Sequence, residues 1–345
     1  MNKSLYLDFI LEQTQKVLSI DSPTGFTAHV ASYVMETYRA LGYHPVQTKK
    51  GGILCEIGGE DCDDAICLEA HIDTLGAMIS QIGENGRLTL TPLGGMEPNN
   101  AEAENCKIYT RSGKIYDGTM QLKNASIHVN KDYHTTTRGY DTMELVLDEK
   151  VSSKEDVLAL DIQVGDIVCF NPRTTLTTSG YLKSRFLDDK LSVGILLGFA
   201  KYVKDENIKL KRKVYQYITV FEEVGHGGAG SIPLDVCEVL SVDMGCVGDG
   251  LSCTEHQVSI CAKDSRGPYH YDVVSALIEA GKRAAIDYAV DVYPFYGSDA
   301  DAALTAGYEV RHGLIGAGVY ASHGYERSHK DGILNTFLLL TEYLA

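Results

Sequence analysis

Two adjacent glutamates stand where an apolar segment meets a run of glycines. The stretch is "VFEEVGHGGAG", residues 220–230, and it continues the apolar run "VYQYITV". Paired carboxylates suit metal-dependent hydrolysis, because one can bind a metal ion while the other takes a proton from water. The glycines also fit G-x-G-x-x-G at Gly225, Gly227 and Gly230, with Asp243 near the spacing of a ribose-binding acid. The segment therefore supports two hypotheses, a metal hydrolase and a dinucleotide-binding enzyme.

Polar residues end other apolar segments in the same way. His71 and Asp73 follow "AICLEA", Asp243 follows "EVLSV", and His323 follows "IGAGVYAS", while "FLDDK" (186–190) brings an acidic pair into a helical pattern. In open α/β sheets ligands bind beyond the carboxyl ends of the strands, so these residues are expected to converge. Two histidines and several carboxylates suit two metal ions that share an oxygen ligand.

Each residue type has a distinct task in the metal hypothesis. A ligating imidazole usually gives its second N–H to a carboxylate, so Asp73 could orient His71. One glutamate of the pair would ligate, and the other would deprotonate the attacking water. The dinucleotide hypothesis is weaker, because "EEV" separates the strand end from the first glycine and Pro233 lies near the start of the helix that should follow.

The elements that must position these residues lie in separate parts of the chain. Residues 1–74 and 181–345 alternate amphipathic helical patterns with apolar, strand-like runs, and we predict that together they form an α/β catalytic domain. Residues 75–180 contain short strand-like segments separated by Gly, Asn and Asp turns. They predict a small, barrel-like, all-β domain inserted into the α/β domain.

The composition excludes several classes of partner. The formal net charge of −16 over 345 residues disfavours binding to nucleic acid or to an anionic membrane surface. No segment approaches the roughly 20 apolar residues of a membrane span, and the N-terminus lacks the apolar region of a signal peptide. The nine cysteines include no C-x-x-C, so a structural zinc ribbon is not indicated. We expect a cytoplasmic protein.

Five motifs, taken in order, resemble the M42 family of dinuclear-metal aminopeptidases, within the group of co-catalytic zinc exopeptidases. They are "AHIDTLG", "FLDDKLSVG", "FEEVGHGGAG", "SVDMG" and "SHGYE", and further matches are "SPTG", "QVGDIVCF" and "YGSDADAA". The resemblance covers nearly the whole chain. It implies a mixed, mostly parallel sheet sandwiched by helices, with a small all-β domain inserted between the His-x-Asp strand and the Asp-Asp helix.

The resemblance also implies the roles of the site residues. Five of them are metal ligands: His71 and Asp243 for one ion, Glu223 and His323 for the other, and Asp188 as the bridge. Glu222 is then the general base, and Asp73 orients His71. Asp299 or Asp301 is a candidate for binding the substrate amine.

The activity implied is release of the N-terminal residue from peptides, with two divalent ions, zinc or cobalt, in each subunit. Family members assemble with the help of the inserted domain, so the resemblance implies a homo-oligomer, of which a large tetrahedral particle is one form. The family usually has His-Ser-Pro and a later Glu at the last ligand. This chain has "HGYERSH", which makes His329 a rival of His323.

Three other functions compete with aminopeptidase activity. The same metal site could cleave another amide, as a deacylase or a different exopeptidase does. A glucanase is disfavoured, because adjacent residues on one strand point to opposite faces and poorly flank one sugar bond. A scaffold protein with a degenerate site would have lost Glu222, which is present.

Overall fold

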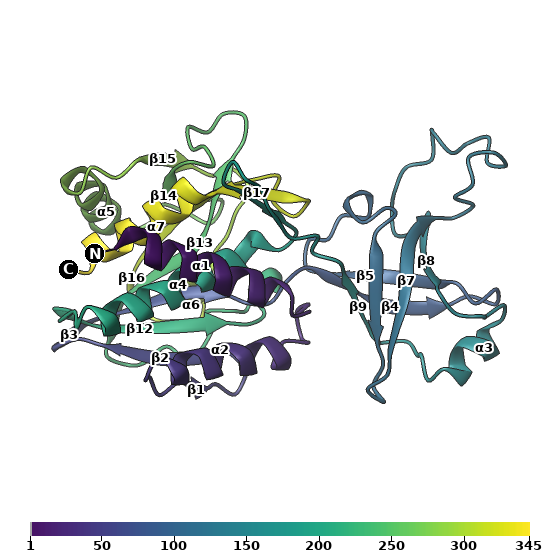
Figure 1. Cartoon of the computed structure of the whole chain (residues 1–345), viewed down its shortest axis with the longest axis horizontal. Coiled ribbons are helices and arrows are strands. Elements are labelled where there is room, and N and C mark those ends of the chain that lie inside the picture. The colour runs from purple at the N-terminus through teal and green to yellow at the C-terminus, as the bar shows by residue number, and fades with distance from the viewer. Residues whose placement is uncertain (1) are drawn as a thin grey trace. The chain divides into compact units, whose positions relative to one another are not determined.

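The computed structural model describes residues 2–345, which divide into two compact units (Figure 1). We call the part up to Asp73 and from Arg173 to Ala345 the α/β unit, and Thr74–Pro172 the β unit. The sequence prediction extended the inserted domain to residue 180. In the structure β10 (Thr175–Leu176) and β11 (Tyr181–Ser184) pair with strands of the large sheet, so this segment belongs to the α/β unit.

The α/β unit is built on an 11-stranded sheet. Its other strands are β1 Val46–Gln47, β2 Ile53–Gly58, β3 Asp61–His71, β12 Arg212–Thr219, β13 Val236–Val247, β14 Val258–Lys263, β15 Tyr288–Val292, β16 Arg311–Tyr320 and β17 Glu326–His329. The order is β1-β2-β12-β3-β13-β16-β17-β11-β10, with β14 beside β16 and β15 beside β14. The central strands β12, β3, β13 and β16 are parallel, and their carboxyl ends therefore lie at the same edge.

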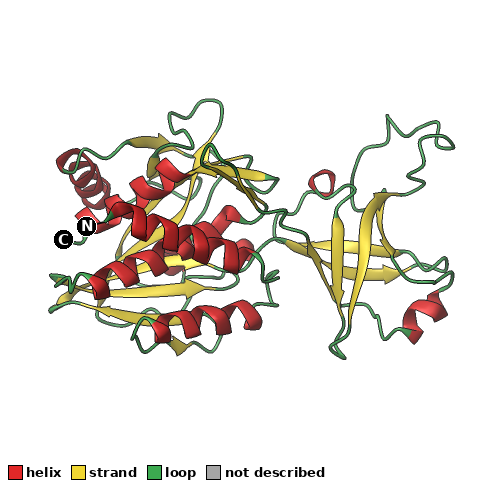
Figure 2. Ribbon diagram, in the orientation of Figure 1, coloured by secondary structure: helices red, strands yellow, loops and turns green. Residues whose placement is uncertain are grey.

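Helices cover both faces of this sheet (Figure 2). They are α1 Lys3–Leu18, α2 Ala28–Ala40, α4 Leu187–Asp205, α5 Tyr271–Arg283, α6 Asp299–Thr305 and α7 Lys330–Tyr343. Gln216 of β12 accepts from Tyr38 of α2 and donates to the Leu196 carbonyl of α4, so α2 and α4 lie on one face. Its neighbour Tyr217 packs in a cluster with Ala300 of α6, which places α6 on the opposite face.

Strands buried on both faces explain the continuous apolar runs in the sequence. In β3 every residue from Ala65 to His71 is buried, and β13 is buried over most of its length. Parallel sheets covered by helices require such strands, because neither face meets water. Among the described residues, no helix has the length and apolar character that a membrane span would need.

The β unit is a closed barrel of antiparallel strands in the order β4-β5-β8-β7-β6-β9. The strands are β4 Gly76–Ile82, β5 Leu88–Leu93, β6 Asn105–Tyr109, β7 Ile115–Leu122, β8 Met143–Leu147 and β9 Ile167–Phe170, and the helical segments are η1 Pro98–Asn100 and α3 Lys154–Ala159. The alternating burial of β8 is typical of a barrel with one apolar face. The predicted fold class, a mostly parallel sheet between helices with an inserted β-barrel, is confirmed.

Candidate metal centre

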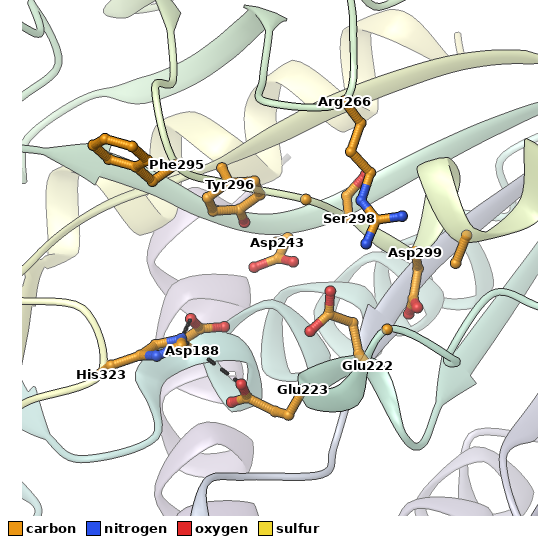
Figure 3. A pocket seen from close by; sticks show the side chains of 13 residues that line it. Asp188, Glu222, Glu223, Asp243, Arg266, Phe295, Tyr296, Ser298, Asp299 and His323 are labelled. Atoms are coloured by element: carbon orange, nitrogen blue, oxygen red, sulfur yellow. Dashed lines mark ion pairs between the residues drawn. The ribbon is translucent and has the colours of Figure 1, made fainter. Parts of the chain in front are cut away.

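The predicted ligands meet at the carboxyl edge of the parallel strands. His71 ends β3, Asp243 lies near the end of β13, and Glu222 begins the 3₁₀ turn η2 (Glu222–Val224) that follows β12. A cavity of about 280 Å³ opens there (Figure 3). It is lined by six of the predicted site residues: Asp188, Glu222, Glu223, Asp243, Asp299 and His323.

Asp188 occupies the centre of the arrangement. Its Oδ1 lies 3.1 Å from Nε2 of His71, and its Oδ2 lies 3.5 Å from Nε2 of His323. Asp188 thus belongs to two groups whose ligand atoms lie within 4.8 Å of one another, one with His71 and Asp243 and one with Glu223 and His323. These are the two ligand groups that the family resemblance implied. Two neighbouring divalent cations with one shared carboxylate would fit this arrangement.

The neighbouring Asp189 has a different role. Its Oδ2 accepts the backbone N–H of His71 at 3.1 Å, and its side chain is fully buried. The peptide between Asp188 and Asp189 is cis. Because it accepts the His71 N–H, Asp189 fixes the end of β3, whereas Asp188 faces both histidines.

Asp73 forms hydrogen bonds with several groups besides the His71 imidazole that it was expected to orient. The acceptor closest to Nδ1 of His71 is the Asp73 carbonyl at 2.9 Å, and the Asp73 carboxylate is 3.7 Å away. This carboxylate instead accepts the Thr24 hydroxyl at 2.7 Å and the backbone N–H groups of Glu222 and Glu223 at 3.2 and 3.4 Å. Asp73 consequently fixes both the tautomer of His71 and the turn that carries the two glutamates.

Glu326 is a site residue that the sequence analysis did not single out. Its carboxylate accepts the backbone N–H of Asp188 at 3.1 Å and that of His323 at 2.9 Å, and only 1% of the residue is exposed. Burial, with the nearby charge of Asp188, raises the pKa of Glu326 to about 8. The available signal was its position three residues after His323 in "HGYE".

The pKa values of the buried carboxylates at this centre are raised, so a nearby positive charge would stabilise their ionised forms. Burial raises the pKa of Glu222 and Glu223 well above the usual range, and burial together with Asp188 raises that of Asp243 to about 7. For His71, burial lowers the pKa, but Glu222 and Asp188 outweigh it and the net direction is upward. Oε1 of Glu223 is buried without a hydrogen-bond partner. A carboxylate oxygen in this position fits a metal ligand, and the donor set suits divalent ions such as zinc.

The two substrate-binding candidates have different environments. Asp299 lines the cavity, where it accepts the Gly228 N–H at 2.6 Å and the Thr219 hydroxyl. Asp301 does not line this cavity. Its carboxylate caps α6 by accepting the N–H of Ser298, and it also accepts the Tyr269 hydroxyl. Of the pair, only Asp299 is placed to meet a ligand.

The glycine run allows a loop to pack directly against Asp299. A Cβ added to Gly227 would lie 2.0 Å from Asp299 Oδ1, and one added to Gly228 would lie 2.2 Å from its carbonyl oxygen. No helix follows the glycines, because the described chain runs from η2 through a loop into β13. The dinucleotide hypothesis is therefore wrong, since its phosphate site requires a helix N-terminus.

Arg266 adds a positive charge to this acidic cavity and was not predicted. Its side chain reaches toward Ser298, Asp299 and Glu222 (Figure 3). Among the described residues, no hydrogen bond or ion pair of its guanidinium group is found, and the residue is exposed. No sequence motif marks it, because its role depends on a loop that folds back over the site.

The rival ligand His329 lies outside the cavity. Its Nε2 is 2.9 Å from the Ser179 carbonyl, and its Nδ1 accepts the backbone N–H of Asp331 at the start of α7. The geometry thus supports His323 as the last ligand of this centre.

The fold and this ligand set define a metal-dependent exopeptidase of the α/β type. The chain belongs to the M42 glutamyl aminopeptidase family, whose sequence profile matches residues 51–339. It is 43% identical over 334 residues to YhfE of Bacillus subtilis strain 168, and the alignment covers 97% of this chain and 96% of that protein. The chain is accordingly an aminopeptidase of the metal-dependent M42 type.

Solved structures share the fold at lower identity. The aminopeptidase APDkam598 from Desulfurococcus kamchatkensis superposes with a TM-score of 0.86 at 23% identity, covering 99% of this chain and 95% of that one. The TET1 peptidase of Pyrococcus horikoshii superposes with a TM-score of 0.84 at 21% identity, covering 97% and 99%, and is described as assembling into a tetrahedron or a large octahedral shell.

Proposed function

We propose that this aminopeptidase releases N-terminal residues from peptides by means of two divalent ions, with Glu222 as the general base. The observation that carries the proposal is the position of Asp188, whose two oxygens face two different histidines at 3.1 and 3.5 Å. His71 and Asp243 would hold one ion, Glu223 and His323 the other, and Asp188 both. Zinc and cobalt suit this mixture of imidazole and carboxylate ligands.

Each protein group has a defined task in peptide cleavage. Divalent ions bound here supply Lewis acidity, which makes water nucleophilic near neutral pH and stabilises negative charge on the scissile carbonyl oxygen. The Glu222 carboxylate, 3.6 Å from Nε2 of His71, accepts the proton of the attacking water and delivers it to the leaving amine. Asp73 holds the Glu222 backbone in place during this transfer.

The cavity wall supports a preference for acidic N-terminal residues. Arg266 contributes a guanidinium group that has no partner among the described residues, and it lies on the side of the cavity near Asp299. A guanidinium group pairs readily with a carboxylate, whereas it repels a lysine or arginine side chain. Asp299, which lines the same cavity, is our candidate for contact with the free α-amine.

The proposal is tested with short peptides that begin with Glu, Leu or Lys, each with a free and with an acetylated amino terminus. We expect loss of only the first residue from free-amine peptides, with Glu cleaved most efficiently. Chelation should abolish cleavage, and zinc or cobalt should restore it. Cleavage of acetylated substrates alone would instead identify a deacylase that uses the same site.

We also propose a homo-oligomer in the cytoplasm. The support is the shared fold with the TET1 peptidase, which forms closed particles. We assign subunit contacts and control of substrate access to the β unit. Besides other copies of the chain, we expect peptide substrates as its partners.

A further inference from the structure

A second cluster of metal-binding side chains lies outside the cavity and belongs entirely to the α/β unit. It consists of His256 before β14, His329 at the end of β17 and Asp331 in the first turn of α7. One ligand atom of each residue lies within 4.8 Å of those of the others. The cluster shares no residue with the lining of the cavity.

The Asp331 carboxylate lies between the two rings. Its Oδ2 is 2.9 Å from Nδ1 of His256 and 3.1 Å from Nδ1 of His329. The two ring centroids are 4.2 Å apart. Ligand atoms around a tetrahedral zinc ion lie about 3.5 Å apart, because each is about 2.1 Å from the ion. The two distances from Asp331 are about half an ångström short of this spacing, so a small outward shift of its carboxylate would bring both to the value around zinc.

The second nitrogen of each ring is already held by an oxygen atom. Nε2 of His329 lies 2.9 Å from the Ser179 carbonyl, and Nε2 of His256 lies 3.2 Å from the Tyr181 hydroxyl. A carbonyl can only accept, so Nε2 of His329 carries the proton. Outer contacts of this kind fix the tautomer of metal-binding histidines and leave the other nitrogen available to the ion.

The hydrogen-bond pattern at His329 leaves a mismatch that a cation would remove. Its Nδ1 accepts the backbone N–H of Asp331, so this nitrogen bears a lone pair. The Asp331 carboxylate, another acceptor, lies 3.1 Å from the same nitrogen. A cation would attract both acceptors, and the displaced N–H, in the first turn of a helix, could bond to water.

We propose that His256, His329 and Asp331 form a third divalent-cation site, which takes zinc or a similar first-row ion. Two imidazoles and one carboxylate leave a fourth position for water, and the side chains of His256 and Asp331 are 42% and 60% exposed, so an ion can enter from solvent. The ion links the segment after β13 to the start of α7. That link steadies β17, whose residue Glu326 holds the backbone of Asp188 and His323.

The test measures zinc bound per chain by mass spectrometry of the metal after equilibrium dialysis. We expect His256→Gln and Asp331→Asn each to lose about one equivalent relative to the native chain. His44→Gln, a matched change at an exposed histidine, should lose none. Equal zinc content in the native chain and both cluster variants would overturn the proposal.

A second measurement separates this site from the catalytic centre. In an Asp188→Asn chain, the third site should still bind zinc, and adding His256→Gln should remove it. Anomalous diffraction at the zinc edge should show a peak between His256 and His329. If zinc binding by Asp188→Asn equals that of the native chain, the proposed two-ion centre fails, whereas the difference caused by His256→Gln still decides the third site.

Discussion

Single residues in this protein act largely by holding the backbone of other residues. Asp73 binds the N–H groups of Glu222 and Glu223, and Glu326 binds those of Asp188 and His323. The candidate ligands therefore keep their spacing through two carboxylates that do not line the cavity. Because hydrogen bonds between charged and backbone groups are stronger than neutral ones, this frame preorganises the centre.

Glu222→Gln tests the role of the proposed base. The amide has nearly the same shape but cannot accept the proton of water, so we expect kcat to fall by about 100- to 10,000-fold. The zinc content should not change, because Glu222 is not one of the proposed ligands. Retention of more than about a tenth of the activity would assign the base to another group.

Arg266→Leu tests the proposed preference for acidic residues. A charge-assisted hydrogen bond is worth about 1.5–3 kcal/mol, so the ratio of kcat/KM for Glu-peptides over Leu-peptides should fall about 10- to 100-fold. Arg266→Lys keeps the charge without the planar fork and should preserve part of the ratio. An unchanged ratio in Arg266→Leu would show that this guanidinium group does not recognise the acidic side chain of the substrate.

The sequence singled out the side chains that cluster at the candidate metal centre more completely than the residues that hold them in place. His71, Asp188 and His323 follow or precede apolar elements in a recognisable order, and the structure brings them together. Glu326 and Arg266 carry no such pattern, because their functions depend on contacts across long sequence separations. Asp301 was considered for substrate binding, but the capping of α6 explains it.

Among the elements, α2 shows how local sequence fixes a helix end. Gly42 has a φ of 83°, and its N–H bonds to the Arg39 carbonyl, while the N–H of Tyr43 reaches back to Tyr38. This is the Schellman arrangement, in which a left-handed residue ends the helix.

Gly42→Ala should lower the free energy of unfolding by about 1 kcal/mol, because an L side chain is strained in the left-handed region. Apart from the two chain neighbours of Gly42, no atom of the described residues lies within 4 Å of a Cβ built there, so steric clash does not contribute. Gly42→Asn is the matched control, since asparagine tolerates this conformation and should cost less. Urea unfolding of both variants checks the order, and equal losses would argue against a backbone origin.

Residues 173–180 were assigned to the wrong side of a boundary for a physical reason, since the inserted domain was predicted to end at residue 180 and the β unit ends at Pro172. β10 and β11 are short, like the strands of the β unit, and strand length does not reveal the partner strand. β10 pairs with β11, and β17, the strand that joins β11 to the large sheet, follows more than 140 positions later, at Glu326–His329. Strand pairings between segments so far apart in the sequence cannot be recognised from the local residue pattern.

For the whole molecule we expect an assembly with a mass that is a multiple of 37.7 kDa. Large apolar side chains are exposed on the α/β unit, including Leu234, Tyr271 and Phe295, the last with 94% of its surface exposed. Such side chains are often covered in oligomers. Light scattering coupled to size-exclusion chromatography checks the mass, and a monomer at micromolar concentration would contradict the expectation.

The discontinuous α/β unit has a consequence for biosynthesis. The β unit is one uninterrupted stretch, Thr74–Pro172. All strands of the barrel are therefore synthesised before the second part of the α/β unit. The central sheet must wait, because β3 lies between β12 and β13, and β16 and β17 come still later. Non-local pairings of this kind slow folding. The barrel can therefore fold while the α/β unit is incomplete. The apolar strand β3 stays unpaired until its neighbours β12 and β13 have been synthesised, and a chaperone could bind it during that interval.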